Sequence, residues 1–280
     1  MSNNHIRVPL LNVQRQTQSI RSEIDSAIAR VVDHGLFIMG PEVAALEQKI
    51  AEFCGAAHAV ACASGSDALL LPLMALGAGP GDEVITVPFT FFATAGSISR
   101  LGARPTFVDI DRETFNMDPA KLRQNLESRS PEALKRVKAI MPVHLFGQCA
   151  QMDEILAVAQ RFDIPVIEDA AQAIGAEFEG RKAGSMGLCG AFSFFPSKNL
   201  GGAGDGGLIT TNDPGFADKL KILRNHGGER RYYHRIVGMN SRGGHHRNRG
   251  GQHQSQQPSA GGGGHSTSPV GTARDTKAAR

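Results

Sequence analysis

A lysine that stands between a short apolar segment and a run of glycines constrains this sequence more than any other feature. Residues 191–195 are predicted to form a buried strand, and residues 208–211 a second one. Between them, Pro196 ends the first strand, and five glycines allow sharp turns or a close approach of the backbone to a bound group. The side chain of Lys198 is therefore expected to project from a rigid strand end over a tightly folded loop.

The amine of Lys198 can be interpreted in two ways. A partly buried amine has a lowered pKa and can attack an aldehyde as a nucleophile, which is what a covalent cofactor lysine needs. An ordinary surface lysine beside a glycine turn is the alternative. Other motifs in the chain bear on the choice.

An apolar strand over residues 164–167 leads directly into Glu168 and Asp169. Open α/β sheets place their ligands at the carboxyl ends of such strands. A buried carboxylate there is costly unless a cation pairs with it, and a protonated pyridine nitrogen is such a cation. Capping of a following helix by Asp169 is the alternative interpretation.

A second strand end carries small residues. The strand predicted at 57–63 is followed by Ser64, Gly65, Ser66 and Asp67, which open a helix predicted at 68–76. Unpaired N–H groups and the positive end of the helix dipole at such a turn favour a phosphate. An ordinary helix N-cap by Ser66 or Asp67 would produce the same pattern.

Two further residues lie at strand ends, and the sequence allows two roles for each of them. Phe91 follows a strand predicted at 83–87, and it could hold a flat ring by stacking or simply belong to the core. His144 follows a strand predicted at 137–143, where it could act in catalysis or serve as a hydrogen-bonded structural residue.

Taken together, these motifs resemble a known family. Residues 193–207, Ser-Phe-Phe-Pro-Ser-Lys-Asn-Leu-Gly-Gly-Ala-Gly-Asp-Gly-Gly, are similar to the cofactor-lysine motif of the DegT family of sugar-nucleotide aminotransferases. The turn at 64–67 resembles the family's Ser-Gly-Thr-Asp, with a serine replacing the threonine and keeping the hydroxyl. Residues 169–172 and 237–242 match further family patterns, so the resemblance covers about residues 6–242.

The resemblance implies a pyridoxal 5′-phosphate enzyme. It would transfer an amino group, with L-glutamate as the expected donor, to a keto-sugar nucleotide in amino-sugar, cell-surface polysaccharide or secondary-metabolite biosynthesis. Lys198 would bind the cofactor and move the proton, and its presence argues against the dehydratase branch, which carries histidine there. The other implied roles are Asp169 at the ring nitrogen, Gln172 at the phenolic oxygen, Phe91 on the ring, Gly65, Ser66, Asp67 and Ser193 at the phosphate, and Asn240 at the phosphate of a partner subunit.

Alternating strands and helices between residues 57 and 211 predict an α/β fold with a mostly parallel sheet and helices on both faces. By resemblance this is the large domain of the fold type I pyridoxal-phosphate enzymes, acting as a homodimer. We expect an N-terminal helical segment at 1–35 and the cofactor-binding domain at 36–242.

Residues 243–280 depart from the family pattern. They are rich in Gly, Ser, Gln and His, with Val270 the only large aliphatic residue, and are expected to be disordered. The family's small C-terminal domain is thus expected to be largely missing, through truncation or a frame shift. An inactive cofactor-binding remnant and, less favoured, a regulatory or nucleic-acid-binding protein are the alternatives.

Composition and charge narrow the classes of protein to which the chain can belong. The net charge is +3, but residues 243–280 hold five basic residues and one acidic residue, so residues 1–242 carry −1 and show no footprint for nucleic acid. No apolar run is long enough for a membrane span, and no signal-peptide core is present, so a cytoplasmic protein is expected. The four cysteines lack the spacing of a metal site and are expected to be buried free thiols.

Overall fold

The structure is a computed structural model, and it describes residues 9, 11–230 and 232–243. The expected disordered tail lies outside the described residues except for Gly243. Within the described part, no helix is both long and apolar enough to cross a lipid bilayer.

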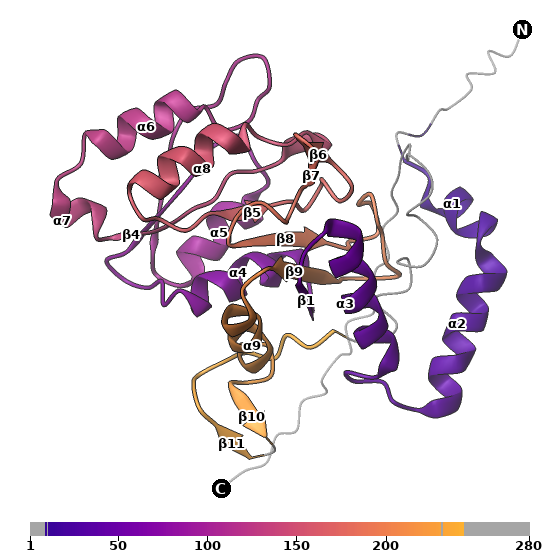
Figure 1. The fold of residues 1–280 in the computed structure, drawn as a ribbon. Coiled ribbons are helices and arrows are strands. Elements are labelled where there is room, and N and C mark those ends of the chain that lie inside the picture. The colour runs from indigo at the N-terminus through magenta and orange to yellow at the C-terminus, as the bar shows by residue number, and fades with distance from the viewer. Residues whose placement is uncertain (1–8, 10, 231, 244–280) are drawn as a thin grey trace, which may run out of the picture.

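Strands from across the chain form one central layer (Figure 1). In the order across the layer they are β3 (Arg104–Phe107), β2 (Glu83–Thr86), β4 (Val137–Ile140), β5 (Ile167–Asp169), β8 (Cys189–Ser193), β9 (Gly207–Thr211) and β1 (His58–Cys62). Parallel bridges from Ile140 to Val166 and from Val143 to Asp169 join the first three strands to the other four. Only β9 runs antiparallel to its neighbours, so the prediction of a mostly parallel sheet is confirmed.

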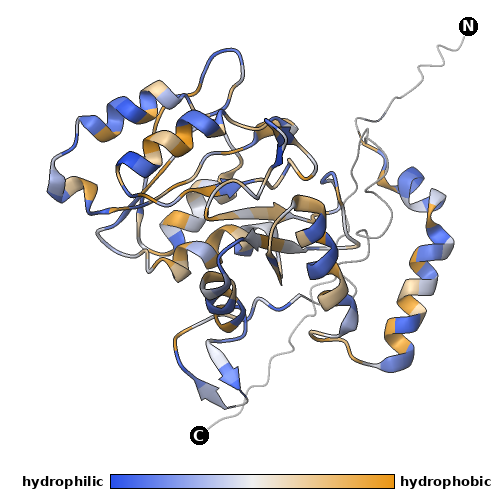
Figure 2. Ribbon diagram, viewed as in Figure 1, coloured by the Kyte–Doolittle hydropathy of each residue, from blue (hydrophilic) through white to orange (hydrophobic). Residues whose placement is uncertain are grey.

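Helices cover both faces of this layer, as the sequence predicts. One face packs against α4 (Gly65–Ala75), α5 (Phe92–Arg100) and α9 (Pro214–Leu223). The other packs against α3 (Pro41–Cys54), α6 (Pro119–Glu127) and α8 (Met152–Arg161). Successive side chains in a strand point to opposite faces of the sheet. Val84 therefore packs in the core of the first face and Ile85 in the core of the second. Figure 2 shows the central strands as mostly hydrophobic and α6 as mostly hydrophilic.

Smaller elements complete the chain. They are α1 (Val13–Ser19), α2 (Arg21–His34), α7 (Pro131–Leu134), the 3₁₀ turn η1 (Leu145–Gly147), and the hairpins β6 (Glu177–Phe178) with β7 (Arg181–Lys182) and β10 (Gly228–Arg230) with β11 (Tyr233–His234). Figure 1 shows α1 and α2 as an arm beside the body, and Val31 is the only buried residue of that arm among those described. All four cysteines are free, and three of them are buried.

The topology positions the candidate site. Because β1, β2, β4, β5 and β8 all run in the same direction, their carboxyl ends meet at one edge of the sheet. These five ends and the segments that follow them carry the residues singled out in the sequence, apart from Asn240.

Candidate active site

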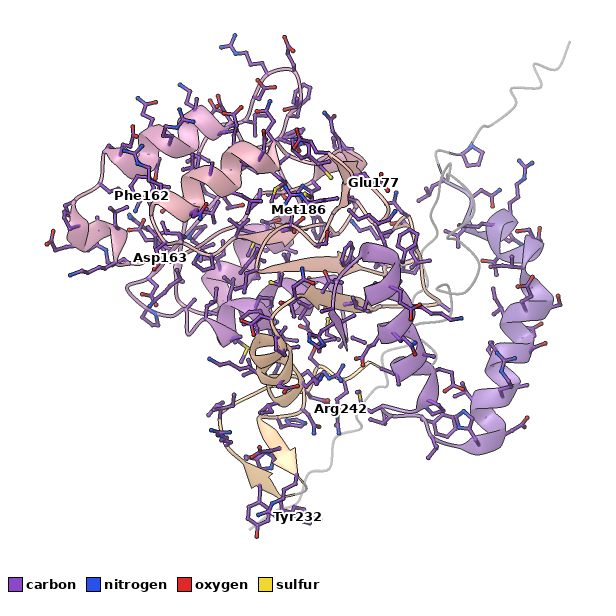
Figure 3. The ribbon with its side chains drawn as sticks, viewed as in Figure 1. Phe162, Asp163, Glu177, Met186, Tyr232 and Arg242 are labelled. Atoms are coloured by element: carbon purple, nitrogen blue, oxygen red, sulfur yellow. The ribbon has the colours of Figure 1, made fainter. Side chains whose placement is uncertain are left out.

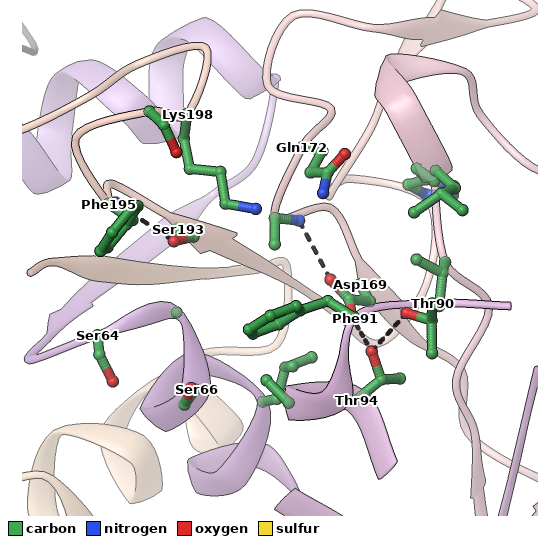
Figure 4. Close-up of a pocket in the computed structure, with 18 of the residues that line it drawn as sticks. Ser64, Ser66, Thr90, Phe91, Thr94, Asp169, Gln172, Ser193, Phe195 and Lys198 are labelled. Carbon is green, nitrogen blue, oxygen red and sulfur yellow. Dashed lines mark hydrogen bonds between the residues drawn. The ribbon is translucent and has the colours of Figure 1, made fainter. Parts of the chain in front are cut away.

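A cavity of about 360 Å³ lies at this carboxyl edge (Figure 4). Side chains from all five strand ends contribute to its wall. The predicted site residues that line it are Gly65, Ser66, Phe91, Asp169, Gln172, Ser193 and Lys198. The structure therefore brings seven of the nine predicted site residues to one cavity.

Lys198 enters the cavity from the loop that follows β8. Its side chain is half-buried, and its Nζ lies 6.0 Å from the centre of the Phe91 ring (Figure 4). Burial lowers the pKa of this amine, while the nearby Asp169 carboxylate opposes the shift. The interpretation as an ordinary surface lysine is therefore wrong, and the amine is suited to nucleophilic attack.

Asp169 is buried at the end of β5, and its carboxylate faces the cavity. Its Oδ2 accepts a hydrogen bond of 2.7 Å from the hydroxyl of Thr94, and its Oδ1 accepts one of 3.2 Å from the N–H of Ala171. Burial raises the pKa of this carboxyl, and these hydrogen bonds, together with the nearby Lys198 amine, oppose the rise. No helix begins here, since residues 170–176 form turns, so the alternative of a helix cap is wrong.

The turn between β1 and α4 meets the end of β8 very closely. A Cβ added to Gly65 would stand 2.5 Å from the Cβ of Ser193, and one added to Gly207 would stand 2.2 Å from the carbonyl oxygen of Ser64. Glycine is therefore required at both positions for the three segments to meet. The first N–H groups of α4 have no acceptor within the helix, and the hydroxyl of Ser193 stands beside them.

The cap of α4 differs from both alternatives drawn from the sequence. Ser64, in extended conformation, caps the helix by accepting the N–H of Asp67 at 3.1 Å, whereas Ser66 and Asp67 lie inside the helix. The Asp67 carboxylate turns away from the cavity and accepts the hydroxyl of the buried Ser241 at 2.7 Å. Asp67 is thus absent from the cavity wall formed by the described residues, and it ties the turn to a distant part of the chain.

Phe91 stands immediately before α5, on the cavity wall (Figure 4). Phe91 is 68% exposed, so its interpretation as a core residue is wrong, and the neighbouring Phe92 is 82% exposed. Gln172, from the turn after Asp169, lines the opposite part of the cavity.

His144 and Glu168 are completely buried and contact each other. The Nδ1 of His144 accepts the N–H of Ala150 at 3.1 Å, so its Nε2 carries the hydrogen and donates to Glu168 at 2.9 Å. Glu168 also accepts the N–H groups of Gly184, Met186 and Gly187. Although His144 borders the cavity, both of its nitrogens are engaged, which supports the structural interpretation.

Asn240 lies away from the cavity. It is exposed, pairs with Asn225 through an antiparallel bridge, and accepts a hydrogen bond of 3.2 Å from Arg242. Arg242, labelled in Figure 3, borders a second hollow of about 480 Å³ together with Asp218, Lys221 and Met39. The predicted contact of Asn240 with a partner subunit stays a prediction.

Two polar residues of the site, Thr90 and Thr94, were not predicted from the sequence. Thr94 holds Asp169, and the Thr90 hydroxyl lies 2.7 Å from that of Thr94. Thr94 follows Phe91 by three residues, and residues at this spacing lie on the same face of a helix. This spacing could have placed Thr94 at the site only if a helix had been recognised here.

The chemistry of these side chains fits pyridoxal 5′-phosphate. The space formed by Gly65, which a Cβ would fill, adjoins free helix N–H groups and a hydroxyl, which suit a phosphate. A buried acid suits a protonated ring nitrogen, and an amine of lowered pKa suits an aldehyde.

Comparison with known proteins agrees with this assignment. Residues 18–243 match the DegT/DnrJ/EryC1/StrS aminotransferase family. Over 237 residues, the chain is 48% identical to a protein of Geobacillus stearothermophilus named pleiotropic regulatory protein, covering 85% of this chain and 62% of that one. It is 47% identical over 235 residues to the UDP-2-acetamido-2-deoxy-3-oxo-D-glucuronate aminotransferase of Pseudomonas aeruginosa, covering 84% and 64%. It is equally similar to a UDP-N-acetyl-3-dehydro-alpha-D-glucosamine 3-aminotransferase of Acidithiobacillus ferrooxidans, covering 84% and 62%.

Among solved structures, DesV of S. venezuelae in complex with a ketimine intermediate has a TM-score of 0.83 and 40% identity, covering 89% of this chain and 65% of that one. Members of the family depend on pyridoxal 5′-phosphate, which confirms the predicted cofactor. The structural match confirms the predicted α/β architecture of fold type I. The chain spans slightly less than two thirds of the length of these curated relatives. It belongs to the DegT/DnrJ/EryC1/StrS aminotransferase family.

Proposed function

We propose that this chain binds pyridoxal 5′-phosphate in the cavity at the carboxyl edge and transfers an amino group to a keto-sugar nucleotide. The observation that carries the proposal is the convergence of Lys198, Asp169 and the turn at Gly65 and Ser66 on one cavity. Relatives named as aminotransferases of UDP-linked sugars support the substrate class.

Each side chain has a defined task in this proposal. The bound cofactor supplies an electron-withdrawing ring that stabilises negative charge on an attached carbon. Lys198 would hold the cofactor through its aldehyde carbon and, once displaced by the amino donor, its Nζ would move a proton from the substrate α-carbon to the cofactor C4′ carbon. Asp169 holds the proton on the ring nitrogen, and Phe91 and Gln172 orient the ring. The N–H groups of α4 and the Ser193 hydroxyl bind the phosphate.

We place the reacting ketone at carbon 3 of the sugar. Both aminotransferase relatives described above have a 3-oxo or 3-dehydro sugar in their names. L-Glutamate is the proposed amino donor, and amino-sugar biosynthesis the proposed context.

A homodimer is part of the proposal. Four consecutive apolar residues, Leu36, Phe37, Ile38 and Met39, are 37–59% exposed, which is typical of a surface that a partner covers. Asn240 would then reach the cofactor phosphate of the other subunit. The cytoplasmic location and the domain limits at residues 35 and 242 stay predictions.

The purified chain with added pyridoxal 5′-phosphate tests the proposal. After unbound cofactor is removed, we expect visible absorbance from the lysine-bound cofactor, its loss on addition of L-glutamate, and its return with a 3-keto UDP-sugar. Lys198→Ala should abolish the absorbance. Lys182→Ala is the matched control, because Lys182 is also half-buried but packs on Phe53 outside the cavity. Absorbance without any half-reaction would support the inactive remnant, and absence of absorbance would overturn the assignment.

A further inference from the structure

Two threonines form a chain of hydrogen bonds behind Asp169. Thr94 is fully buried and donates its hydroxyl hydrogen to Asp169 Oδ2 at 2.7 Å. The Thr90 hydroxyl lies 2.7 Å from the Thr94 oxygen (Figure 4). A hydroxyl carries one hydrogen, and that of Thr94 is committed to Asp169. Thr90 must therefore be the donor to Thr94, so the chain runs in one direction, from the cavity wall to the carboxylate.

The start of α5 supplies this hydroxyl together with the aromatic ring of the site. The N–H of Thr94 donates to the carbonyl of Phe91 at 3.1 Å, which closes the first turn of the helix. Phe91 therefore faces the cavity while Thr94, one turn further, faces Asp169. The N-terminal end of a nine-residue helix also has a positive dipole, which favours a negative charge at Asp169.

Few other groups can keep this buried acid ionised. On its own turn, the N–H of Ala171 donates to Oδ1 at the longer distance of 3.2 Å. The titratable groups that act on it are Lys198, from the loop after β8, and His144, from the end of β4. Since the hydrogen of His144 is directed to Glu168, the Thr94 hydroxyl is the shortest donor to Asp169 among the described residues.

We propose that Thr94, supported by Thr90, is a positioning residue that keeps the Asp169 carboxylate ionised and aimed into the cavity. The effect of Thr94 on the cofactor, where Asp169 holds the proton of the ring nitrogen, rests on the proposed function. The effect of Thr94 on Asp169 in the cofactor-free protein is independent of the proposed function.

Unfolding by urea at pH 5 and at pH 9, without cofactor, tests the proposal. Loss of the hydroxyl in Thr94→Val should raise the folded-state pKa of Asp169 further above its unfolded value. A raised folded-state pKa of an acid costs no stability at low pH, where both states hold the proton. The cost grows as pH rises and is complete above the folded-state pKa. We expect the ratio of folding constants, wild type over Thr94→Val, to increase about tenfold or more from pH 5 to pH 9.

Three variants separate this effect from simple damage. Thr86→Val removes an equally buried threonine hydroxyl, which donates to the carbonyl of Met141, and should give a ratio that does not change with pH. Thr94→Ser keeps the hydroxyl and should restore the wild-type profile. In an Asp169→Asn background, the pH dependence caused by Thr94→Val should disappear.

A ratio that stays constant between pH 5 and pH 9 overturns the proposal, as does equal pH dependence in Thr86→Val. If Thr94→Val fails to fold, Thr90→Val tests the same chain at a less buried residue, with a smaller effect of the same sign. A cofactor titration distinguishes the two proposals. If no variant binds pyridoxal 5′-phosphate but the pH dependence is present, only the proposed function fails.

Discussion

Gly65 and Ser193 approach each other so closely that any side chain on the glycine would collide with the serine. An added Cβ would lie 2.5 Å from the Ser193 Cβ, 2.7 Å from its Oγ and 3.1 Å from its Cα. The Cα is part of β8, so rotation of the serine side chain cannot relieve the clash. The contact sets the distance between the start of α4 and the strand that leads to Lys198.

Gly65→Ala is expected to destabilise the protein by about 1–3 kcal/mol, because overpacking forces the backbone of α4 away from β8. The same displacement should weaken binding of the cofactor phosphate. Urea unfolding and a cofactor titration measure the two effects. Gly79→Ala is the control, since an added Cβ there meets nothing within 4 Å. Equal behaviour of the two variants would contradict the close contact.

The Lys198 amine is expected to be unusually reactive in the cofactor-free protein. Burial lowers its pKa, so more of it is uncharged near neutral pH than for an exposed lysine. In Asp169→Asn, the anion that opposes this shift is lost, and the pKa of Lys198 should fall further. Competitive acetylation over a pH series, read by mass spectrometry against the exposed Lys219, measures the midpoint. A midpoint that rises in Asp169→Asn would contradict the geometry.

The sequence was informative where chemistry and local pattern coincide. The motifs around Gly65, Asp169 and Lys198 predicted residues that line one cavity, because each motif follows an apolar strand whose end is marked by Pro, Gly or a charged residue. Parallel strands then bring these ends together without further information.

Features that depend on tertiary packing could not be predicted. Helix α5 contains Gly96, two serines and only one large aliphatic residue, Ile98, so the sequence offers few apolar positions from which to recognise a helix. It forms because Ile98 is completely buried against the sheet and α4. The cap by Ser64 could not be distinguished from one by Ser66, since the choice depends on where the chain leaves the extended conformation. The bond from Ser241 to Asp67 joins residues 174 positions apart.

The loss of unfolding free energy at acid pH should depend on Glu83, at the start of β2. Burial alone would raise its pKa, but hydrogen bonds from Thr106, Arg129 and Arg104 outweigh this and lower the pKa to about 2. Since this value lies below the unfolded one of about 4.5, the stabilisation is present above pH 4.5 and is lost as pH falls toward 2. Arg129→Met should cost about 1.5–3 kcal/mol at pH 7 and less at pH 3.

Thermal or urea unfolding at the two pH values checks this prediction. Arg161→Met is the control, because Arg161 pairs with Glu127 on the surface and such pairs contribute less than about 1 kcal/mol. A cost for Arg129→Met that is the same at pH 3 and pH 7 would argue against an ionised Glu83 in the folded protein.

Glu168→Gln tests the structural role of the buried pair next to the site. Four hydrogens converge on this carboxylate, from His144 and from the backbone of Gly184, Met186 and Gly187. The amide NH₂ of glutamine would face donors and leave buried N–H groups unpaired, so we expect a loss of about 2–5 kcal/mol in unfolding free energy. Glu177→Gln, at an exposed position, should change little. If Glu168→Gln unfolds like the wild type, these hydrogens do not converge on residue 168 in the folded protein.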